Sequence, residues 1–135
     1  MKRFAFPLFL LAFAGLAHAV QPQDPEVIRA MTSELIQLHE TGVALHDQLD
    51  PAKKNQVAAC QAEHGKLPDQ ARALRERAAK LPVLAYRVNL TMAANDAISC
   101  VTCDSDGSAC DSIPPALERI QHQLDTPVED AKQAS

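Results

Sequence analysis

Residues 24–50 read DPEVIRAMTSELIQLHETGVALHDQLD and carry the clearest pattern in the chain. Apolar or small residues recur there at alternating spacings of three and four, which predicts an amphipathic helix of about six turns. Asp24 is suited to cap the start of this helix, Pro25 to occupy its first turn, and Asp50-Pro51 to end it. The stripe consists of Ile28, Met31, Leu35, Leu38, Gly42, Leu45 and Leu49.

Four more helical segments follow, each marked off by proline or glycine. Small side chains gather at residues 91–97, and Gly42 has no side chain, so we expect a close helix crossing between these two segments. No segment shows the alternation that is typical of a strand. The fold class is therefore predicted to be all-α, a small antiparallel helical bundle of four to five helices that is stabilised by disulfides. The additional helices are expected over residues 52–64, 69–80, 83–103 and 114–124.

The first nineteen residues have the pattern of a secretory signal peptide. Lys2 and Arg3 precede an apolar run of roughly 13 residues, which is shorter than the about 20 of a membrane span. Cleavage is expected between Ala19 and Val20, with bacterial-type export to a periplasmic or secreted location. We expect a signal peptide at 1–19, an extended leader at 20–25, a single helical domain at 26–124 and a flexible C-terminal tail at 125–135.

Composition excludes several classes of function. The whole chain has 13 basic and 17 acidic residues and a net charge of −4. Loss of the basic signal peptide would make the net charge of the remaining chain more negative, so we expect no nucleic-acid partner. We also expect no stable membrane insertion after cleavage. There is no tryptophan, one tyrosine (Tyr86), and all four phenylalanines precede residue 14. Stacking platforms for sugars or single-stranded nucleic acid are therefore not expected.

The four cysteines are the chemically distinctive group, and their even number in an exported chain predicts disulfides. Cys60 and Cys100 each lie one helical step from another apolar position, whereas Cys103 ends a predicted helix and Cys110 lies in the loop after it. These positions favour the pairs Cys60–Cys100 and Cys103–Cys110. The alternative that we retain is Cys100–Cys103 with Cys60–Cys110, since residues three apart at a helix end can be bridged.

Cys100 and Cys103 also form a C-x-x-C motif, which raises the possibility of thiol-redox or thiol-based metal-carrying chemistry. Catalytic pairs of this kind usually lie at a helix N-terminus, where the helix dipole lowers the thiol pKa. Here the motif ends a predicted helix and precedes Asp104, which opposes thiolate formation. A structural zinc site usually has two such close pairs. Structural disulfides are therefore the favoured interpretation, and redox or metal chemistry is the alternative.

Two further groups of residues need an explanation. His39 and His46 are seven residues apart on the first helix, roughly 10 Å along its axis, which is too far for one metal ion. We expect them to border the buried face. The acidic loop 104–111 contains Asp-Ser-Asp-Gly but lacks the outer carboxylates of an EF-hand. No motif of a hydrolase, nucleotide-binding protein or zinc protease occurs, so no catalytic residue, metal site or cofactor is predicted.

A binding function is the most specific one that the sequence supports. We expect a non-enzymatic binding or accessory protein that acts on another envelope protein through a helical face. The regular stripe of residues 24–50 and the small residues at 91–97 are candidate surfaces for it. The competing interpretation is that these two faces bury each other inside the bundle.

Overall fold

The structure is a computed structural model that describes residues 23–126. The described part contains helices and no strand, which confirms the predicted all-α bundle. The expected signal peptide, its cleavage site at Ala19 and Val20, and most of the C-terminal tail lie outside the described residues. The elements are α1 (Pro25–Gln48), α2 (Lys54–His64), α3 (Leu67–Ala78), α4 (Leu84–Cys100), the 3-10 turn η1 (Ser108–Ser112) and α5 (Ile113–Asp125).

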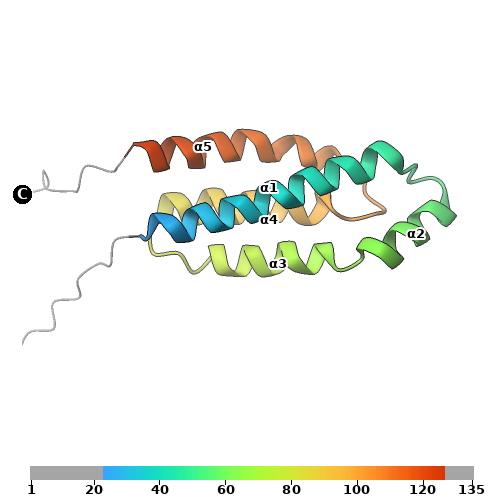
Figure 1. Cartoon of the computed structure of the whole chain (residues 1–135), viewed down its shortest axis with the longest axis horizontal. Helices are drawn as coiled ribbons and strands as arrows, with labels where there is room; N and C mark the ends of the chain where they lie inside the picture. The colour runs from blue at the N-terminus through green and yellow to red at the C-terminus, as the bar shows by residue number, and fades with distance from the viewer. Residues whose placement is uncertain (1–22, 127–135) are drawn as a thin grey trace, which may run out of the picture.

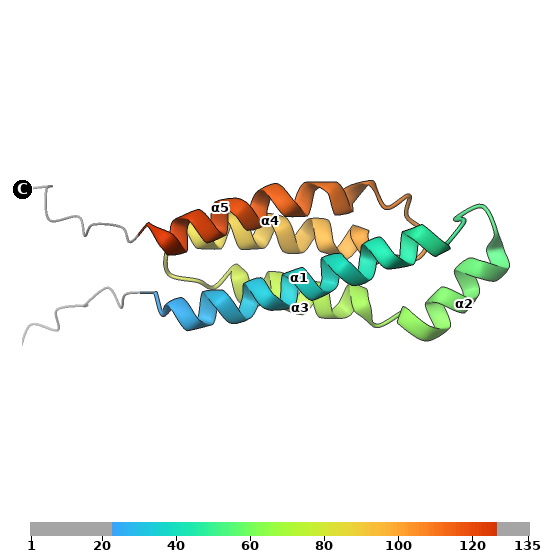
Figure 2. The same cartoon turned by 45° about the horizontal axis from the view of Figure 1, so that its top comes forward.

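Four of the helices form the bundle, and α4 contacts each of the other three, α1, α3 and α5. The chain reverses direction between α3 and α4 and again between α4 and α5, so these sequence neighbours are antiparallel (Figure 1). The long helix α1 extends past the bundle at the end where α2 lies (Figure 2). Within the described residues, α2 shares no extensive contact with any other helix.

The stripe of α1 is buried from Ile28 to Gly42, whereas Leu45 and Leu49 at its end are half-buried. Ile28, Leu35 and Leu38 are at most 3% exposed, and Asp24 caps the helix by accepting a hydrogen bond from the amide of Glu26 at 2.9 Å. Both features match the prediction. The small side chains of α4 are buried as well, and Gly42 lies directly against Cys100, as expected for a close helix crossing. Other buried side chains that complete the core are Ala71, Leu74, Leu90, Ala94, Ala97, Ile113 and Ile120.

The end of α4 is where the prediction is wrong. The helix was expected to continue to Cys103, but it ends at Cys100. The chain then turns, with the amide of Thr102 donating to the carbonyl of Ser99 and its hydroxyl to the carbonyl of Ile98. Val101 is fully buried in this turn although it lies outside the helix. The expected loop 104–111 also differs, because η1 occupies its second half.

No helix within residues 23–126 combines the length and the hydropathy that a membrane crossing requires.

Candidate functional site

The four cysteines form two disulfides, and neither predicted pairing is correct. Cys60 of α2 bonds Cys103 in the turn after α4, with their Cα atoms 5.9 Å apart. Cys100 bonds Cys110 of η1, with a Cα separation of 4.7 Å. The structure thus adopts the third possible pairing, in place of both Cys60–Cys100 with Cys103–Cys110 and Cys100–Cys103 with Cys60–Cys110.

The early end of α4 explains this pairing. A continuous helix would have placed Cys103 one turn beyond Cys100 on nearly the same face. Instead, the turn after Cys100 carries Cys103 to α2, and η1 folds Cys110 back onto the buried side of Cys100. All four cysteines are at most 7% exposed, including Cys110, which was expected in the loop after the helix.

The same pairing separates the two cysteines of the C-x-x-C motif. Cys100 and Cys103 belong to different disulfides, and the described residues contain no free cysteine. They also contain no group of three His, Cys, Asp or Glu side chains placed to hold a metal ion. The C-x-x-C motif is therefore neither a free dithiol nor a disulfide of its own in this structure.

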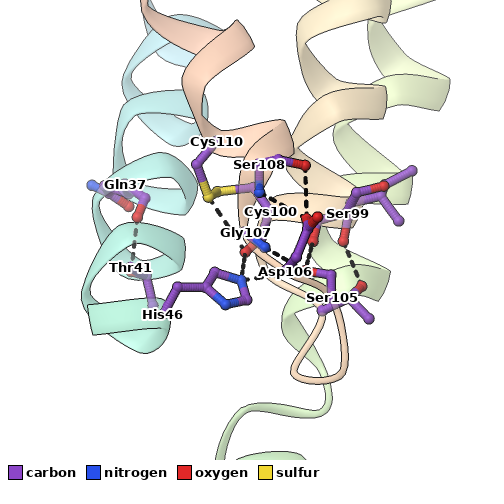
Figure 3. Close-up of a disulfide and its surroundings, with 12 residues drawn as sticks. Gln37, Thr41, His46, Ser99, Cys100, Ser105, Asp106, Gly107, Ser108 and Cys110 are labelled. Atoms are coloured by element: carbon purple, nitrogen blue, oxygen red, sulfur yellow. Dashed lines mark hydrogen bonds between the residues drawn. A yellow bond between two sulfur atoms is a disulfide. The ribbon is translucent and has the colours of Figure 1, made fainter. Parts of the chain in front are cut away.

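His46 joins the end of α1 to the end of α4 (Figure 3). Its Nε2 atom lies 2.8 Å from the carbonyl oxygen of Cys100 and 3.3 Å from Oγ of Ser105. Because a carbonyl oxygen only accepts, Nε2 must carry the proton. Cys110 Sγ is 3.6 Å from the same oxygen, but a disulfide sulfur has no proton to donate. His46 is thus the side chain that satisfies this carbonyl at the C-terminus of α4.

The pair of His46 and Ser105 superficially resembles a nucleophile with its base. The hydroxyl of Ser105 donates to the carbonyl of Ser99 at 2.7 Å, so its oxygen is left to accept from His46. A base that activates a serine must instead accept the hydroxyl proton. The direction of these hydrogen bonds therefore assigns the pair a structural role.

The acidic loop 104–111 meets His46 of α1 at Ser105 and Gly107, and Asp106 stabilises the loop from within. The carboxylate of Asp106 accepts from the amide of Ser108 at 3.0 Å and from its hydroxyl at 2.7 Å. These bonds, with a smaller contribution from the charge of His46, lower the pKa of Asp106 below its usual range. Gly107 has φ 77°, and a Cβ there would lie 2.7 Å from Cγ of His46, so glycine is required both by conformation and by space.

His39 and His46 are both half-buried at the edge of the α1 stripe, as predicted, but only His46 takes part in this network. A groove of about 400 Å³ lies nearby, between the end of α1 and α2. Leu45 of α1 and Leu49, which directly follows that helix, line one side of it, and Cys60 and His64 of α2 line the other. The Cys60–Cys103 disulfide is thus the principal link that holds α2 beside the bundle.

Among the described residues, the most exposed large apolar side chains lie on α4, on a face that was not predicted. Leu84, Val88 and Met92 are 62, 44 and 60% exposed and follow one another at a spacing of four. They form one stripe about 12 Å long, on the side of α4 opposite to its buried alanines. A hollow of about 350 Å³ borders the stripe, and Ala79 and Thr91 contribute small side chains to its lining. We call the three exposed residues the α4 outer face.

The signal for this face was present in the sequence as a second period of apolar residues in the same helix. Leu84, Val88 and Met92 repeat with helical spacing, as do the buried positions on the other side. No family model, curated protein or solved structure matches the chain, so the candidate site is defined by its own geometry.

Proposed function

We propose that the protein is an exported, non-enzymatic binding protein that acts on another envelope protein through the α4 outer face. The observation that carries this proposal is the exposure of Leu84, Val88 and Met92 in one continuous stripe. Exposed large apolar side chains that adjoin one another are a feature of interaction surfaces, whereas isolated ones are common everywhere. A helical stripe of this spacing matches the way in which helices recognise each other.

The binding surface in this proposal differs from the one that the sequence suggested. The α1 stripe from Ile28 to Gly42 and the alanines of 91–97 pack inside the bundle, where Leu35, Ala93 and Ala97 are fully buried. They are not available to a partner. Among the described residues, the α4 outer face has the most exposed large apolar side chains, and we assign the binding function to it.

Two further features support an exported protein without catalytic activity. The basic and apolar pattern of residues 1–19 is that of a signal peptide, and disulfides persist in oxidising compartments. The hydrogen bonds of His46 and Ser105 are directed against nucleophilic chemistry. Binding through a rigid, disulfide-bonded scaffold requires no reactive group.

The test is to capture a partner protein with the wild-type protein and with two variants, each of which replaces two exposed apolar side chains. The protein, purified after export, is immobilised and exposed to an envelope extract of the cells that produce it. The double variant V88S/M92S removes apolar area from the α4 outer face. The matched control I36S/V43S removes it from α1, where both residues are 38% exposed. Circular dichroism verifies that each variant is folded.

We expect the wild-type protein and the I36S/V43S control to retain the same protein, and V88S/M92S to retain at least tenfold less. Sedimentation at increasing concentration shows whether that partner is a second copy of this chain. Equal capture by V88S/M92S would contradict the assignment to α4. A strictly monomeric protein with no captured partner would contradict the binding function itself.

A further inference from the structure

Three arginines border the α4 outer face, one from each of three helices. Arg87 of α4 lines the hollow together with Val88 and Met92, and its guanidinium donates to the carbonyl of Leu81 at 3.2 Å. Arg75 of α3 donates to the side chain of Asn95 at 3.3 Å, one turn beyond the stripe.

Arg119 of α5 completes the border on the opposite side. Its guanidinium donates to the side-chain oxygen of Asn89 at 3.3 Å, and Asn89 directly follows Val88 in α4. Arg75 and Arg87 therefore occupy the edge next to α3, and Arg119 occupies the edge next to α5. The apolar stripe lies between cationic groups on both of its long sides.

These three arginines differ from the other arginines of the described chain in their partners. Arg29, Arg72 and Arg77 each form a salt bridge with a carboxylate, to Glu26, Asp69 and Glu34 respectively. Within residues 23–126, no salt bridge involves the three that border the α4 outer face, whose hydrogen bonds go to uncharged oxygens.

Acidic residues do occur near this border without pairing to it. Asp96, the one acid of α4, is half-buried one turn beyond Met92, and Glu118 precedes Arg119 in α5. Neither forms a salt bridge with the bordering arginines in the described structure. The positive charge around the stripe is thus not neutralised locally, although the chain as a whole has four more acidic than basic residues.

We propose that the α4 outer face binds an amphipathic helix whose apolar stripe is flanked by aspartate or glutamate side chains. This inference rests on the proposed function and specifies the chemistry of the partner. Leucine or methionine side chains of the partner would pack along Leu84, Val88 and Met92, and one of them would enter the hollow beside Thr91. Its carboxylates would form paired hydrogen bonds with the guanidinium groups on both edges.

The shape and charge of the surface favour a helix over other anionic partners. A nucleic acid would leave the exposed apolar side chains without a complementary surface, and the acidic chain as a whole would repel it. Adsorption to an anionic membrane usually involves a face rich in lysine and arginine over a longer helix. Three apolar residues over about 12 Å, with cations on both sides, are complementary to one helix that has an apolar stripe with anions on both sides.

The experiment compares two synthetic peptides on the isotope-labelled, exported protein. Both are about 18 residues long, above the about 12–15 residues below which isolated helices are marginal in water, and both have the same leucine stripe. One has glutamate at the flanking positions and the other has lysine. Nuclear magnetic resonance reports which amides shift and yields the dissociation constant.

We expect the glutamate peptide to shift amides of α4 and of the adjoining sides of α3 and α5. Its affinity should exceed that of the lysine peptide at least tenfold and should fall with added salt. The triple variant R75Q/R87Q/R119Q should weaken this binding at least tenfold. The matched control R29Q/K53Q/K54Q loses the same charge from α1 and the approach to α2 and should bind as the wild type does.

Each other outcome overturns the inference in a recognisable way. Equal binding of both peptides at α4 would remove the role of the arginines and leave the proposed binding function in place. Absence of shifts at α4 with either peptide would overturn the helical partner, while the capture experiment decides the binding function separately. Binding to phosphatidylglycerol vesicles that V88S/M92S abolishes would assign the face to a membrane instead.

Discussion

Gly42 of α1 and Cys100 of α4 lie so close that a Cβ atom on Gly42 would overlap Sγ of Cys100 and lie 2.8 Å from its carbonyl oxygen. Neither atom is free to move. The sulfur is bonded to Cys110, and the oxygen belongs to the backbone at the end of α4 and accepts from His46. The absence of a side chain at Gly42 therefore determines how closely α1 approaches the disulfide-bonded end of the bundle.

Replacement of Gly42 by alanine should destabilise the protein, although alanine is the better helix former. The gain in helix propensity is about 1 kcal/mol, whereas overpacking against a rigid contact costs about 1–3 kcal/mol. We expect G42A to lower the free energy of unfolding in urea by up to about 2 kcal/mol net. The control S33A, at an exposed position of the same helix, should change it by less than about 0.5 kcal/mol. Stabilisation by G42A would contradict the close contact.

Removal of the His46 side chain should leave the carbonyl of Cys100 without its donor. Because this oxygen lies in a part-buried environment, we expect H46A to lower the free energy of unfolding by about 1–2 kcal/mol. H39A is the matched control, seven residues earlier on α1 and also half-buried. Equal losses in the two variants would show that the hydrogen bond to Cys100 contributes nothing.

The two disulfides should differ in what they hold in place. Cys60 and Cys103 are 43 residues apart, and α2 has few other contacts, so C60A/C103A should release α2 in particular. Hydrogen exchange followed by mass spectrometry should then show loss of protection in Lys54–His64 while α3, α4 and α5 remain protected. In the chain-entropy model this cross-link also contributes about 4 kcal/mol to global stability.

The second disulfide is the comparison for this experiment. Cys100 and Cys110 lie in the core and are at most 2% exposed, so C100A/C110A should reduce protection across the bundle and not only at one helix. Persistent protection of α2 in C60A/C103A would show that side-chain contacts, and not the bond to Cys103, hold this helix.

The pKa of Asp106 should depend on Ser108. The folded protein stabilises the ionised carboxylate through both donors of Ser108, which lowers its pKa below the about 3.9 of an unfolded aspartate. A lowered pKa contributes stability that is present above about pH 4 and is lost as the pH falls through the folded-state value. We expect S108A to raise the pKa of Asp106, measured by carbon-detected titration, and S112A to leave it unchanged. A constant pKa in S108A would refute the role of its hydroxyl.

The features of the fold that could be predicted from the sequence are those that depend on neighbours within a few residues. Asp24 with Pro25 begins α1 as expected, and the stripe through Leu35 is buried because its period matches the helix. The burial of Ala71, Leu74 and Ala78 in α3 follows the same rule. These patterns depend on residues only a few positions apart, so they can be recognised before the packing of the helices is known.

The end of α4 and the disulfide pairing depend on contacts that the sequence does not display. Neither Val101 nor Thr102 is a helix breaker, yet α4 ends before them. The turn that follows buries Val101 and places Cys103 where it can bond Cys60. Similarly, the position of His46 at the border was predicted, but its role requires Cys100, 54 residues further along the chain.

The α4 outer face illustrates a different limit. Two sets of residues in α4 repeat with helical spacing, one large and apolar and one mostly small. Hydrophobicity alone would bury Leu84, Val88 and Met92. The structure buries Ala93, Ala94 and Ala97 instead, because α4 has three close neighbours and small side chains permit their approach.

Photo-crosslinking in the cells that produce the protein tests most directly whether the α4 outer face is where it binds. A benzoylphenylalanine at Val88 reports on this face, and one at Val43, exposed to a similar extent on α1, is the control. We predict a light-dependent adduct with one envelope protein at Val88 and none at Val43. Equal adducts at both positions, or none at Val88, would contradict the account.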